Sequence, residues 1–265
     1  MIKKIILTIM ALSIMVTSVA CGGSKDKNTL SQIKEKGKIV LGTSADYPPY
    51  EFHKLINGKD EIVGFDVEIA KHIAADLGVE LEIIDMKFEG LLASLVTDDI
   101  DFVVAGMVPK PDRAKVVDFS IPYYSGNQRM IVRKNDQDKL NTPEDFKGLK
   151  IGVQKSTTQE DIAAEKFTEA EVIGLSKITD LVLELTNNKI DGIILAEPVA
   201  EAYISKNPNF YMPEVILGQE DGITVGVNKG NADLLEAINK TLEKLINDGA
   251  IDKLVQEATA LAETE

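Results

Sequence analysis

One arginine of this chain stands where it could hold a negatively charged ligand. Arg113 lies at the end of a loop that follows an apolar run, passes Gly106 and contains Pro109 and Pro111. A planar guanidinium binds a carboxylate or a phosphate through two parallel, charge-assisted hydrogen bonds. A surface arginine that only supports a turn explains the loop equally well. An anion site is therefore one of two interpretations of this loop.

A polar loop and three aromatic residues offer further binding chemistry. Ser156-Thr157-Thr158 precedes a predicted helix, so its backbone N–H groups and the positive end of the helix dipole favour an anion. A plain helix N-cap is the alternative interpretation. Tyr47, Tyr50 and Phe88 stand in loops or at strand ends, where flat rings can enclose an aliphatic or amide side chain. Each ring alone is more typical of a core residue.

Groups suited to catalysis or metal binding are few. The chain has two histidines, His53 and His72, and it lacks a Gly-x-Ser-x-Gly elbow, a P-loop and a His-Glu-x-x-His motif. His72 and Glu68 have a helical spacing that could form half of a metal site, but a solvated pair is the more common outcome. The acidic residues of Asp98–Asp101 lie at a predicted turn, where such residues are ordinary. We therefore predict a protein that is not an enzyme and has no metal or cofactor.

The first residues have the pattern of an export signal. Two lysines precede an apolar run at residues 5–15, and small residues lead to Cys21, the only cysteine of the chain. The run is too short to span a bilayer as a helix. We predict a lipoprotein signal peptide at 1–20, lipid attachment at Cys21 and a flexible tether at 21–29. An ordinary secreted protein with one stray cysteine is the alternative.

The composition is that of a folded, acidic protein. Of the 265 residues, 44% are hydrophobic, which is enough for substantial cores, and the formal net charge at pH 7 is -14. Such acidity argues against nucleic acid or an anionic membrane surface as the main partner. It sets no limit on a small ligand that one local arginine binds.

Strand and helix patterns alternate along the chain and position these residues, which predicts a mostly parallel sheet covered on both faces. We expect Asp66 and a residue near Ser176 to cap two of the helices, and Asn57-Gly58 to turn a hairpin. Two strand-helix sets match at a constant offset, which indicates a weak structural repeat. The matching pairs are Leu95 with Leu185, Ile100-Asp101 with Ile190-Asp191, and Val103-Val104 with Ile193-Ile194.

Two similar sets predict two similar lobes. We assign residues 30–124 and 222–265 to lobe 1 and residues 125–221 to lobe 2, with hinge segments near 125–129 and 217–222. Open α/β sheets bind ligands outside the carboxyl ends of their strands. A cleft between the lobes that opens by hinge bending is therefore expected.

Five segments resemble the polar amino-acid-binding proteins of ATP-binding-cassette importers, which are bacterial extracellular solute-binding lipoproteins of the family 3 type. The resemblance extends from about residue 38 to residue 261 and implies a periplasmic-binding-protein-like α/β fold, with two lobes, a hinge and a ligand cleft between them. The segments are Gly42–Phe52, Val63–Asp66, Ala105–Arg113, Val117–Ser120 and Glu197–Ala200.

The resemblance also implies roles for single residues. Arg113 would hold the α-carboxylate of an amino acid, together with the backbone of Gly106 and Thr158. Tyr47 and Phe88 would flank the side chain of the ligand. The candidate ligand-binding residues are Arg113, Gly106, Val108, Thr158, Gln159, Tyr47, Phe88, Tyr50, Asp46 and Glu197.

Three positions depart from the family pattern. Val108 stands in place of a hydroxyl residue, and Ser44 in place of an aspartate that several relatives for basic or amide side chains carry. Ala196 replaces the aspartate that normally pairs with the α-ammonium of the ligand, and a buried cation without a partner costs several kcal/mol. Either another carboxylate takes over or the ligand has no free α-ammonium. The candidate carboxylates are Glu197, Asp46, Glu51 and Glu89.

We therefore predict the substrate-binding component of an ABC importer for amino acids. It would act as a monomer that captures an extracellular amino acid and delivers it to a membrane permease, which links it to an ATPase as a further partner. It would be anchored by lipid on the outer face of the cell membrane. The alternative is an exported lyase on the same fold that resembles cyclohexadienyl dehydratase.

Overall fold

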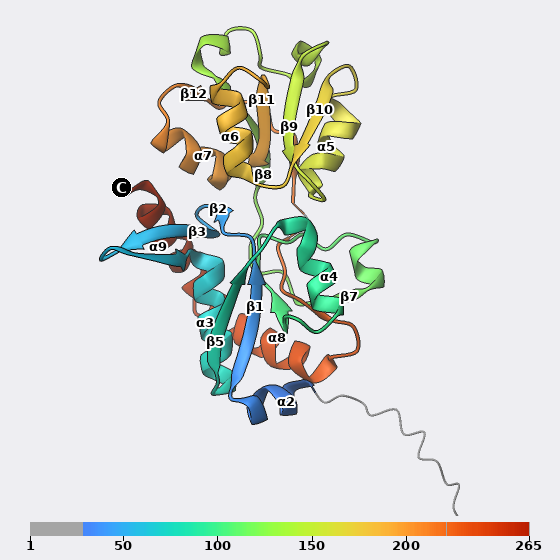
Figure 1. Ribbon diagram of the computed structural model, residues 1–265, viewed down its shortest axis with the longest axis vertical. Helices are drawn as coiled ribbons and strands as arrows, with labels where there is room; N and C mark the ends of the chain where they lie inside the picture. The colour runs from blue at the N-terminus through green and yellow to red at the C-terminus, as the bar shows by residue number, and fades with distance from the viewer. Residues whose placement is uncertain (1–28, 221, 265) are drawn as a thin grey trace, which may run out of the picture.

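The computed structural model describes residues 29–220 and 222–264, which form two lobes stacked along the long axis of the molecule (Figure 1). The predicted signal peptide and Cys21 lie outside the described residues. The two-lobed α/β architecture predicted from the sequence is confirmed. The exact lobe boundaries stay a prediction.

Lobe 1 contains β1 (Lys38–Thr43), β5 (Glu80–Asp85), β6 (Phe102–Val103), β7 (Val117–Phe119) and β14 (Gly226–Asn228), with helices α2 (Thr29–Lys36), α3 (Phe65–Leu77), α4 (Leu91–Val96), α8 (Ala232–Asn247) and α9 (Ala250–Glu263). Its five-stranded sheet has the order β5-β1-β6-β14-β7. β1 is parallel to β5 and β6, whereas β14 returns from the C-terminal part of the chain and pairs antiparallel with β6 and β7.

Lobe 2 contains β8 (Asn127–Arg133), β9 (Lys150–Gln154), β10 (Glu171–Leu175), β11 (Gly192–Ala196), β12 (Phe210–Tyr211) and β13 (Gly218–Gln219), with helices α5 (Thr158–Lys166), α6 (Ile178–Thr186) and α7 (Glu197–Lys206). Its sheet has the order β10-β9-β11-β8-β12, and β13 also pairs with β8. Single 3-10 turns lie at Phe88–Gly90, Arg113–Lys115, Lys134–Asp136 and Pro143–Phe146.

A small hairpin sheet extends lobe 1 beside the junction of the lobes. It is formed by β2 (Asp46–Tyr47), β3 (Glu51–Ile56) and β4 (Lys59–Val63). Asn57 and Gly58 turn the hairpin with φ values of 52° and 78°. Positive φ at both central residues is the signature of a type I′ turn, so the predicted hairpin is confirmed.

The predicted repeat corresponds to an equivalent aspartate hydrogen bond in each lobe. The carboxylate of Asp101 accepts a hydrogen bond from the backbone N–H of Val40 at 2.8 Å. The carboxylate of Asp191 accepts one from the N–H of Lys150 at 2.9 Å. Asp101 thus fixes the turn before β6 to β1, and Asp191 fixes the turn before β11 to β9, at equivalent places of the two sheets.

The repeat extends to the packing below each sheet. A Cβ on Gly42 would lie 2.3 Å from Cδ1 of Ile100, and a Cβ on Gly152 would lie 2.6 Å from Cδ1 of Ile190. Real carbon atoms do not approach so closely, so a side chain at either position would displace an isoleucine that packs at the matching place of the repeat. Ile100 and Ile190 thus occupy matching positions in the two lobes, as the sequence repeat predicted.

One predicted helix cap is wrong, and the other lies one residue from Ser176. Asp66 is the second residue of α3, the N-cap is Gly64, and the Asp66 side chain is fully buried with partners elsewhere in lobe 1. The N-cap of α6 is Lys177 and not Ser176, and its side chain forms no cap hydrogen bond. In both places the helix end is satisfied by tertiary contacts, which local sequence does not reveal.

The chain crosses between the lobes twice, and the two crossings are hydrogen-bonded to each other. The N–H of Glu220 donates to the carbonyl of Gly126 at 2.9 Å, and the N–H of Leu217 donates to that of Gln128 at 2.8 Å. Such paired segments suit a hinge, because small changes in their backbone dihedrals move one lobe relative to the other.

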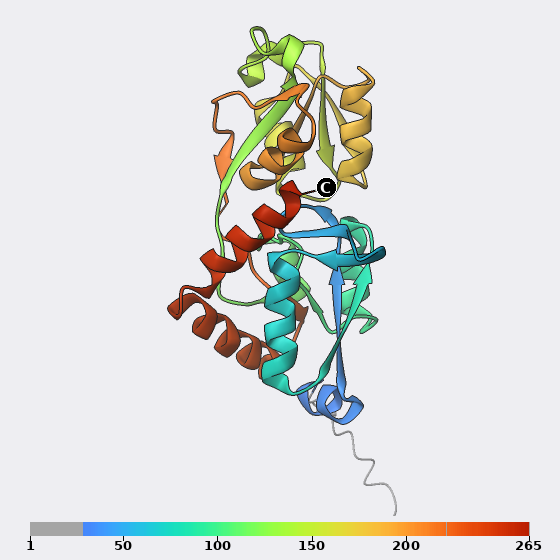
Figure 2. The same ribbon diagram turned by 90° about the vertical axis from the view of Figure 1, so that its left-hand side faces the viewer.

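A further contact between the lobes involves the C-terminal helix. Figure 2 shows α9 rising along lobe 1 until its end lies next to lobe 2. There Ala262 of α9 packs with Phe52 and Val63 of the hairpin sheet and with Ala202 of α7. Apolar side chains of both lobes therefore share one small core beside the cleft.

Candidate functional site

A cavity lies between the lobes at the carboxyl ends of β1, β6 and β9, where the fold predicts a ligand site. Its volume is about 20 Å³, so the two lobes leave little space between them here. Its lining is formed by Ser44, Tyr47, Glu51, Phe88, Ala105, Gly106, Val108, Arg113, Gln154, Thr157, Thr158 and Gln159. Residues of both lobes thus face one enclosed space.

Arg113 bridges the lobes at one side of this cavity. Its Nη1 donates to the carbonyl of Val108 at 2.7 Å, and its Nη2 donates to the carbonyl of Ser156 in lobe 2 at 2.6 Å. Its guanidinium carbon lies 5.4 Å from the centre of the Phe88 ring. Burial lowers the pKa of Arg113, yet an arginine stays charged near neutral pH. Neutral carbonyls bind this cation here, so its full charge can attract an anion.

Tyr47 closes the cavity against lobe 2. Its hydroxyl accepts hydrogen bonds from Nε2 of Gln159 at 3.1 Å and from the backbone N–H of Ala196 at 3.2 Å. Gln159 also donates to Oε1 of Gln128 at 2.9 Å, and Gln128 donates to Glu220 at 2.5 Å. A chain of polar side chains therefore leads from the cavity to the hinge.

Two buried carboxyl groups in this region each have one oxygen without a hydrogen-bond partner among the described residues. Glu51 is 1% exposed, and its Oε2 has no hydrogen-bond partner among the described residues. Burial, followed by the nearby charge of Asp66, raises the pKa of Glu51 well above its ordinary value. Glu220 also leaves its Oε2 without such a partner, and burial raises its pKa to about 8. The region around the cavity is therefore rich in acids that lack a cation.

Most of the predicted ligand-binding residues meet at the cavity. Of the candidate set, Tyr47, Phe88, Gly106, Val108, Arg113, Thr158 and Gln159 line it. The N–H of Gly106, which the resemblance assigned to a ligand carboxylate, already donates to the Asp66 carboxylate at 2.8 Å. Thr158 begins α5 directly after its N-cap Thr157, so its N–H lies at a helix start.

Three of the predicted residues do not line the cavity. Tyr50 is fully buried, and its ring packs 4.4 Å from that of Phe65. Glu197 forms an ion pair with Arg129. Asp46 is bonded across the cleft, as described next. Of the four carboxylates considered as partners of a ligand ammonium, only Glu51 faces the cavity, since Glu89 accepts a hydrogen bond from Ser176 at 2.5 Å.

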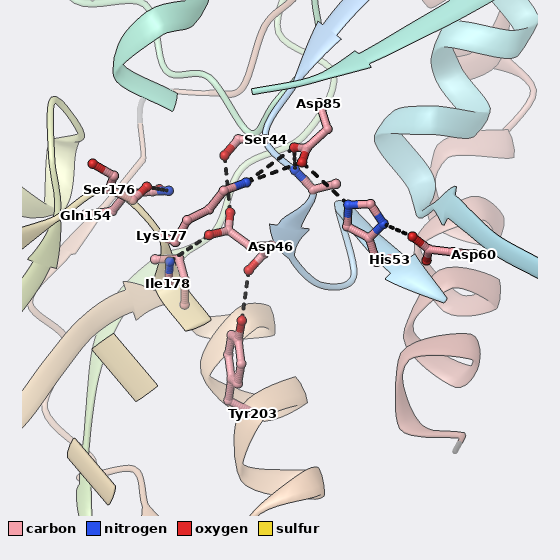
Figure 3. A network of polar contacts seen from close by, with 11 residues as sticks. Ser44, Asp46, His53, Asp60, Asp85, Gln154, Ser176, Lys177, Ile178 and Tyr203 are labelled. Atoms are coloured by element: carbon pink, nitrogen blue, oxygen red, sulfur yellow. Dashed lines mark hydrogen bonds and ion pairs between the residues drawn. The ribbon is translucent and has the colours of Figure 1, made fainter. Parts of the chain in front are cut away.

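Asp46 connects the lobes through the start of α6, in the network that Figure 3 shows. Its Oδ2 accepts a hydrogen bond from the N–H of Ile178 at 2.7 Å, and its backbone carbonyl accepts one from the Tyr203 hydroxyl at 2.9 Å. Nζ of Lys177 lies 3.4 Å from Oδ1 of Asp85. A carboxylate of lobe 1 thus caps a helix of lobe 2, and these contacts hold the lobes closed.

The family comparison agrees with this geometry. The model of the bacterial extracellular solute-binding proteins, family 3, matches residues 39–259. This chain belongs to that family. The match covers both sheets, the crossings and the whole cavity lining.

Similar proteins of this family bind amino acids. The arginine-binding extracellular protein ArtP of Bacillus subtilis is 37% identical over 257 residues, which are 95% of this chain and 96% of that protein. The structure of AbpA, an amino acid ABC transporter substrate-binding protein of Streptococcus pneumoniae bound to L-arginine, superposes with a TM-score of 0.85 at 34% identity, over 89% of this chain and 100% of that one.

A second solved structure bears on the alternative function. The ancestral amino acid-binding protein AncCDT-1, a precursor of cyclohexadienyl dehydratase, has a TM-score of 0.80 at 32% identity and covers 87% of this chain and 99% of its own. That neighbour is an amino acid-binding protein. The family and its members thus confirm the predicted binding protein of the amino acid ABC transporter class, and not the lyase.

The part of the chain in the structure gives no sign of a membrane span or a metal centre. Within residues 29–220 and 222–264, no helix has both the length and the apolar character that a bilayer crossing requires. Over the same ranges, His, Cys, Asp and Glu side chains form no group of three or more that could hold a metal ion.

Two residues in or near the site escaped the sequence analysis. Gln154 is the last residue of β9, and the rule that ligands lie outside strand ends could have singled it out. Glu220 carries no such signal, because nothing in its local sequence shows that a hinge acid is buried against Gln128.

Proposed function

We propose that this protein is the substrate-binding component of an ABC importer and that its ligand is arginine. The observation that carries the proposal is one cavity lined by a buried cation, Arg113, and by Glu51, whose buried Oε2 has no hydrogen-bond partner among the described residues. A ligand with a carboxylate for Arg113 and a cationic group for Glu51 matches such a site. Arginine-binding relatives that are similar over nearly the whole chain support this choice.

In this proposal Arg113 binds the α-carboxylate by exchanging its contact with the Ser156 carbonyl for the stronger contact with an anion. Thr158 adds its N–H at the start of α5, while Tyr47 and Phe88 enclose the ligand side chain. Gly106 contributes by letting the backbone approach closely, since its N–H is bound to Asp66. Val108 contributes its carbonyl, which orients Arg113.

Closure of the lobes allows the importer to distinguish the ligand-bound protein from the empty one. We propose that the contacts of Asp46 and Lys177 form fully when a ligand fills the cavity, and that a permease with its ATPase recognises this closed form. The mature chain would act as a monomer that Cys21 anchors through lipid to the outer face of the cell membrane.

A thermal-shift panel of amino acids tests the proposed ligand. A ligand that binds only the folded protein raises its melting temperature in proportion to the logarithm of ligand concentration over Kd. We expect L-arginine to raise it most, L-lysine less, and acidic amino acids not at all. A panel in which no amino acid raises the melting temperature would contradict the proposal.

A further inference from the structure

Two carboxyl groups share a hydrogen bond beside the cavity, and they differ in their surroundings. Glu51 comes from β3 and Asp66 from the first turn of α3, and both are buried. Asp66 accepts from the N–H of Gly106 at 2.8 Å and from the Tyr123 hydroxyl at 2.8 Å. Within residues 29–220 and 222–264, no donor binds Oε2 of Glu51.

This asymmetry decides which group carries a proton. Two buried carboxylates in contact cannot both be ionised at low cost. The donors of Gly106 and Tyr123 favour the ionised form of Asp66, and its pKa is raised only to about 6, mainly by burial. Burial and the charge of Asp66 raise the pKa of Glu51 well above its ordinary value. Glu51 is therefore the protonated member and donates to Asp66.

The charged groups around Glu51 reinforce this assignment. Asp46 on β2 and Asp85 on β5 both add negative potential and raise the pKa of Glu51. The nearest lysine of this network, Lys177, is paired with Asp85. Arg113 is bound by the carbonyls of Val108 and Ser156. Among the described residues, no lysine or arginine forms an ion pair with Glu51.

Glu51 nevertheless lines the cavity, so a ligand cation can supply the missing charge. We propose that the Glu51–Asp66 pair holds one proton in the empty receptor and releases it to solvent when a positively charged group of the ligand takes its place. The step breaks the O–H bond of Glu51, the proton goes to water or buffer, and the carboxylate then faces the cation. This inference rests on the proposed function, because it needs a cationic ligand in this cavity.

Proton release makes affinity depend on pH in a defined direction. Where the empty receptor holds a proton that the complex lacks, raising the pH favours binding, by about tenfold in affinity per pH unit for one proton. The gain ends above the pKa of the pair, where no proton remains to be released. Asp66 is a positioning residue in this scheme, since it orients Glu51 and fixes the Gly106 loop without facing the ligand.

Isothermal titration of the full chain with L-arginine tests the proposal, in buffers of different ionisation heat such as phosphate and Tris near neutral pH. We expect the observed heat to depend on the buffer, with about one proton released per arginine bound. Glu51→Gln, which keeps the shape of the side chain, should remove the buffer dependence. Glu220→Gln should retain it, which excludes the other buried acid as the source.

The outcomes separate the two proposals. Arginine binding without any buffer dependence would overturn proton release and leave the proposed function intact, whereas no binding at all would defeat the proposed function. Proton release that persists in Glu51→Gln would also overturn the assignment. If Glu51→Gln does not fold, the pH profile of the wild-type Kd decides, because a flat profile contradicts the proposal and a rising affinity supports it.

Discussion

At the scale of single residues, the cavity combines a buried cation with a buried acid that is protonated in the empty protein. Arg113 is a buried cation bound by neutral carbonyls, and Glu51 is a buried acid with a free oxygen. Both arrangements cost free energy in the empty protein, because buried charges and polar groups are destabilising unless they are paired. A ligand that carries both charges would remove both costs.

Glu220 gives a prediction about stability and pH. Its pKa in the folded protein is about 8, above the ordinary value of 4.5. Between these values the folded state binds a proton that the unfolded state lacks, so stability falls as the pH rises through this window. Glu220→Gln keeps a hydrogen-bond acceptor for Gln128 and removes the titration.

We therefore expect Glu220→Gln to raise the melting temperature at pH 8 more than at pH 5. Thermal unfolding at both pH values measures the difference. Glu214→Gln, a change at a glutamate outside the cavity lining, serves as the control and should show no such dependence. Equal shifts for Glu220→Gln at the two pH values would contradict the account.

At the scale of the elements, the two sheets share one hydrogen bond from an aspartate to the backbone of a neighbouring strand. Asp101 and Asp191 bind the N–H groups of Val40 and Lys150 at equivalent positions. Replacing either by alanine should leave a backbone donor without its partner, at a cost of about 1–3 kcal/mol.

Hydrogen exchange can measure this cost locally. In Asp101→Ala the amide of Val40 should exchange faster while that of Lys150 is unchanged, and Asp191→Ala should show the reverse. Each variant is thus the control of the other. Unchanged exchange at both amides in both variants would show that these carboxylates do not fix the turns.

The start of α6 provides a second prediction for the elements. Asp46→Ala combined with Tyr203→Phe removes two hydrogen bonds between the lobes, each of which contributes about 0.5–1.5 kcal/mol. The empty protein should then populate a more open form, with a larger radius of gyration in small-angle X-ray scattering.

The matched control is Asp60→Ala combined with Tyr211→Phe, which changes the same residue types on the hairpin and on β12. It should leave the radius of gyration unchanged. If both double variants behave alike, the contacts of Asp46 do not stabilise closure.

Local sequence predicted the elements and the repeat but not the contacts between lobes. The constant offset of Ile100-Asp101 and Ile190-Asp191 anticipated the shared turn, because the same packing needs the same side chains. The role of Asp46 depends on Ile178, which lies 132 residues away in the chain. Such a contact exists only when the lobes close, so no local pattern encodes it.

The candidate site was predicted in the same uneven way. The position of Arg113 after an apolar strand and a proline loop pointed to the cleft, where the structure places it. Tyr50 and Glu197 also lie in segments that resemble the family. The Tyr50 ring nevertheless packs on Phe65, and the Glu197 carboxylate pairs with Arg129, both outside the cavity lining. Which side of a loop a residue faces depends on tertiary packing, which motif spacing does not determine.

At the scale of the whole molecule, two lobes with matching sheets meet over one cavity and share a hydrogen-bonded pair of crossings. The cavity uses residues of both lobes, so a bound ligand is itself a contact between them. Ligand binding and lobe closure are therefore expected to stabilise each other, as linkage requires.

The central claim is that Arg113 holds the carboxylate of an amino acid between the lobes. Isothermal titration of L-arginine into the wild-type protein, Arg113→Ala and Arg113→Lys tests it most directly. Breaking a buried charge pair costs about 3–5 kcal/mol, so Arg113→Ala should weaken Kd by about 100-fold or more, and Arg113→Lys less. Folded Arg113→Ala that binds arginine with an unchanged Kd would contradict the account.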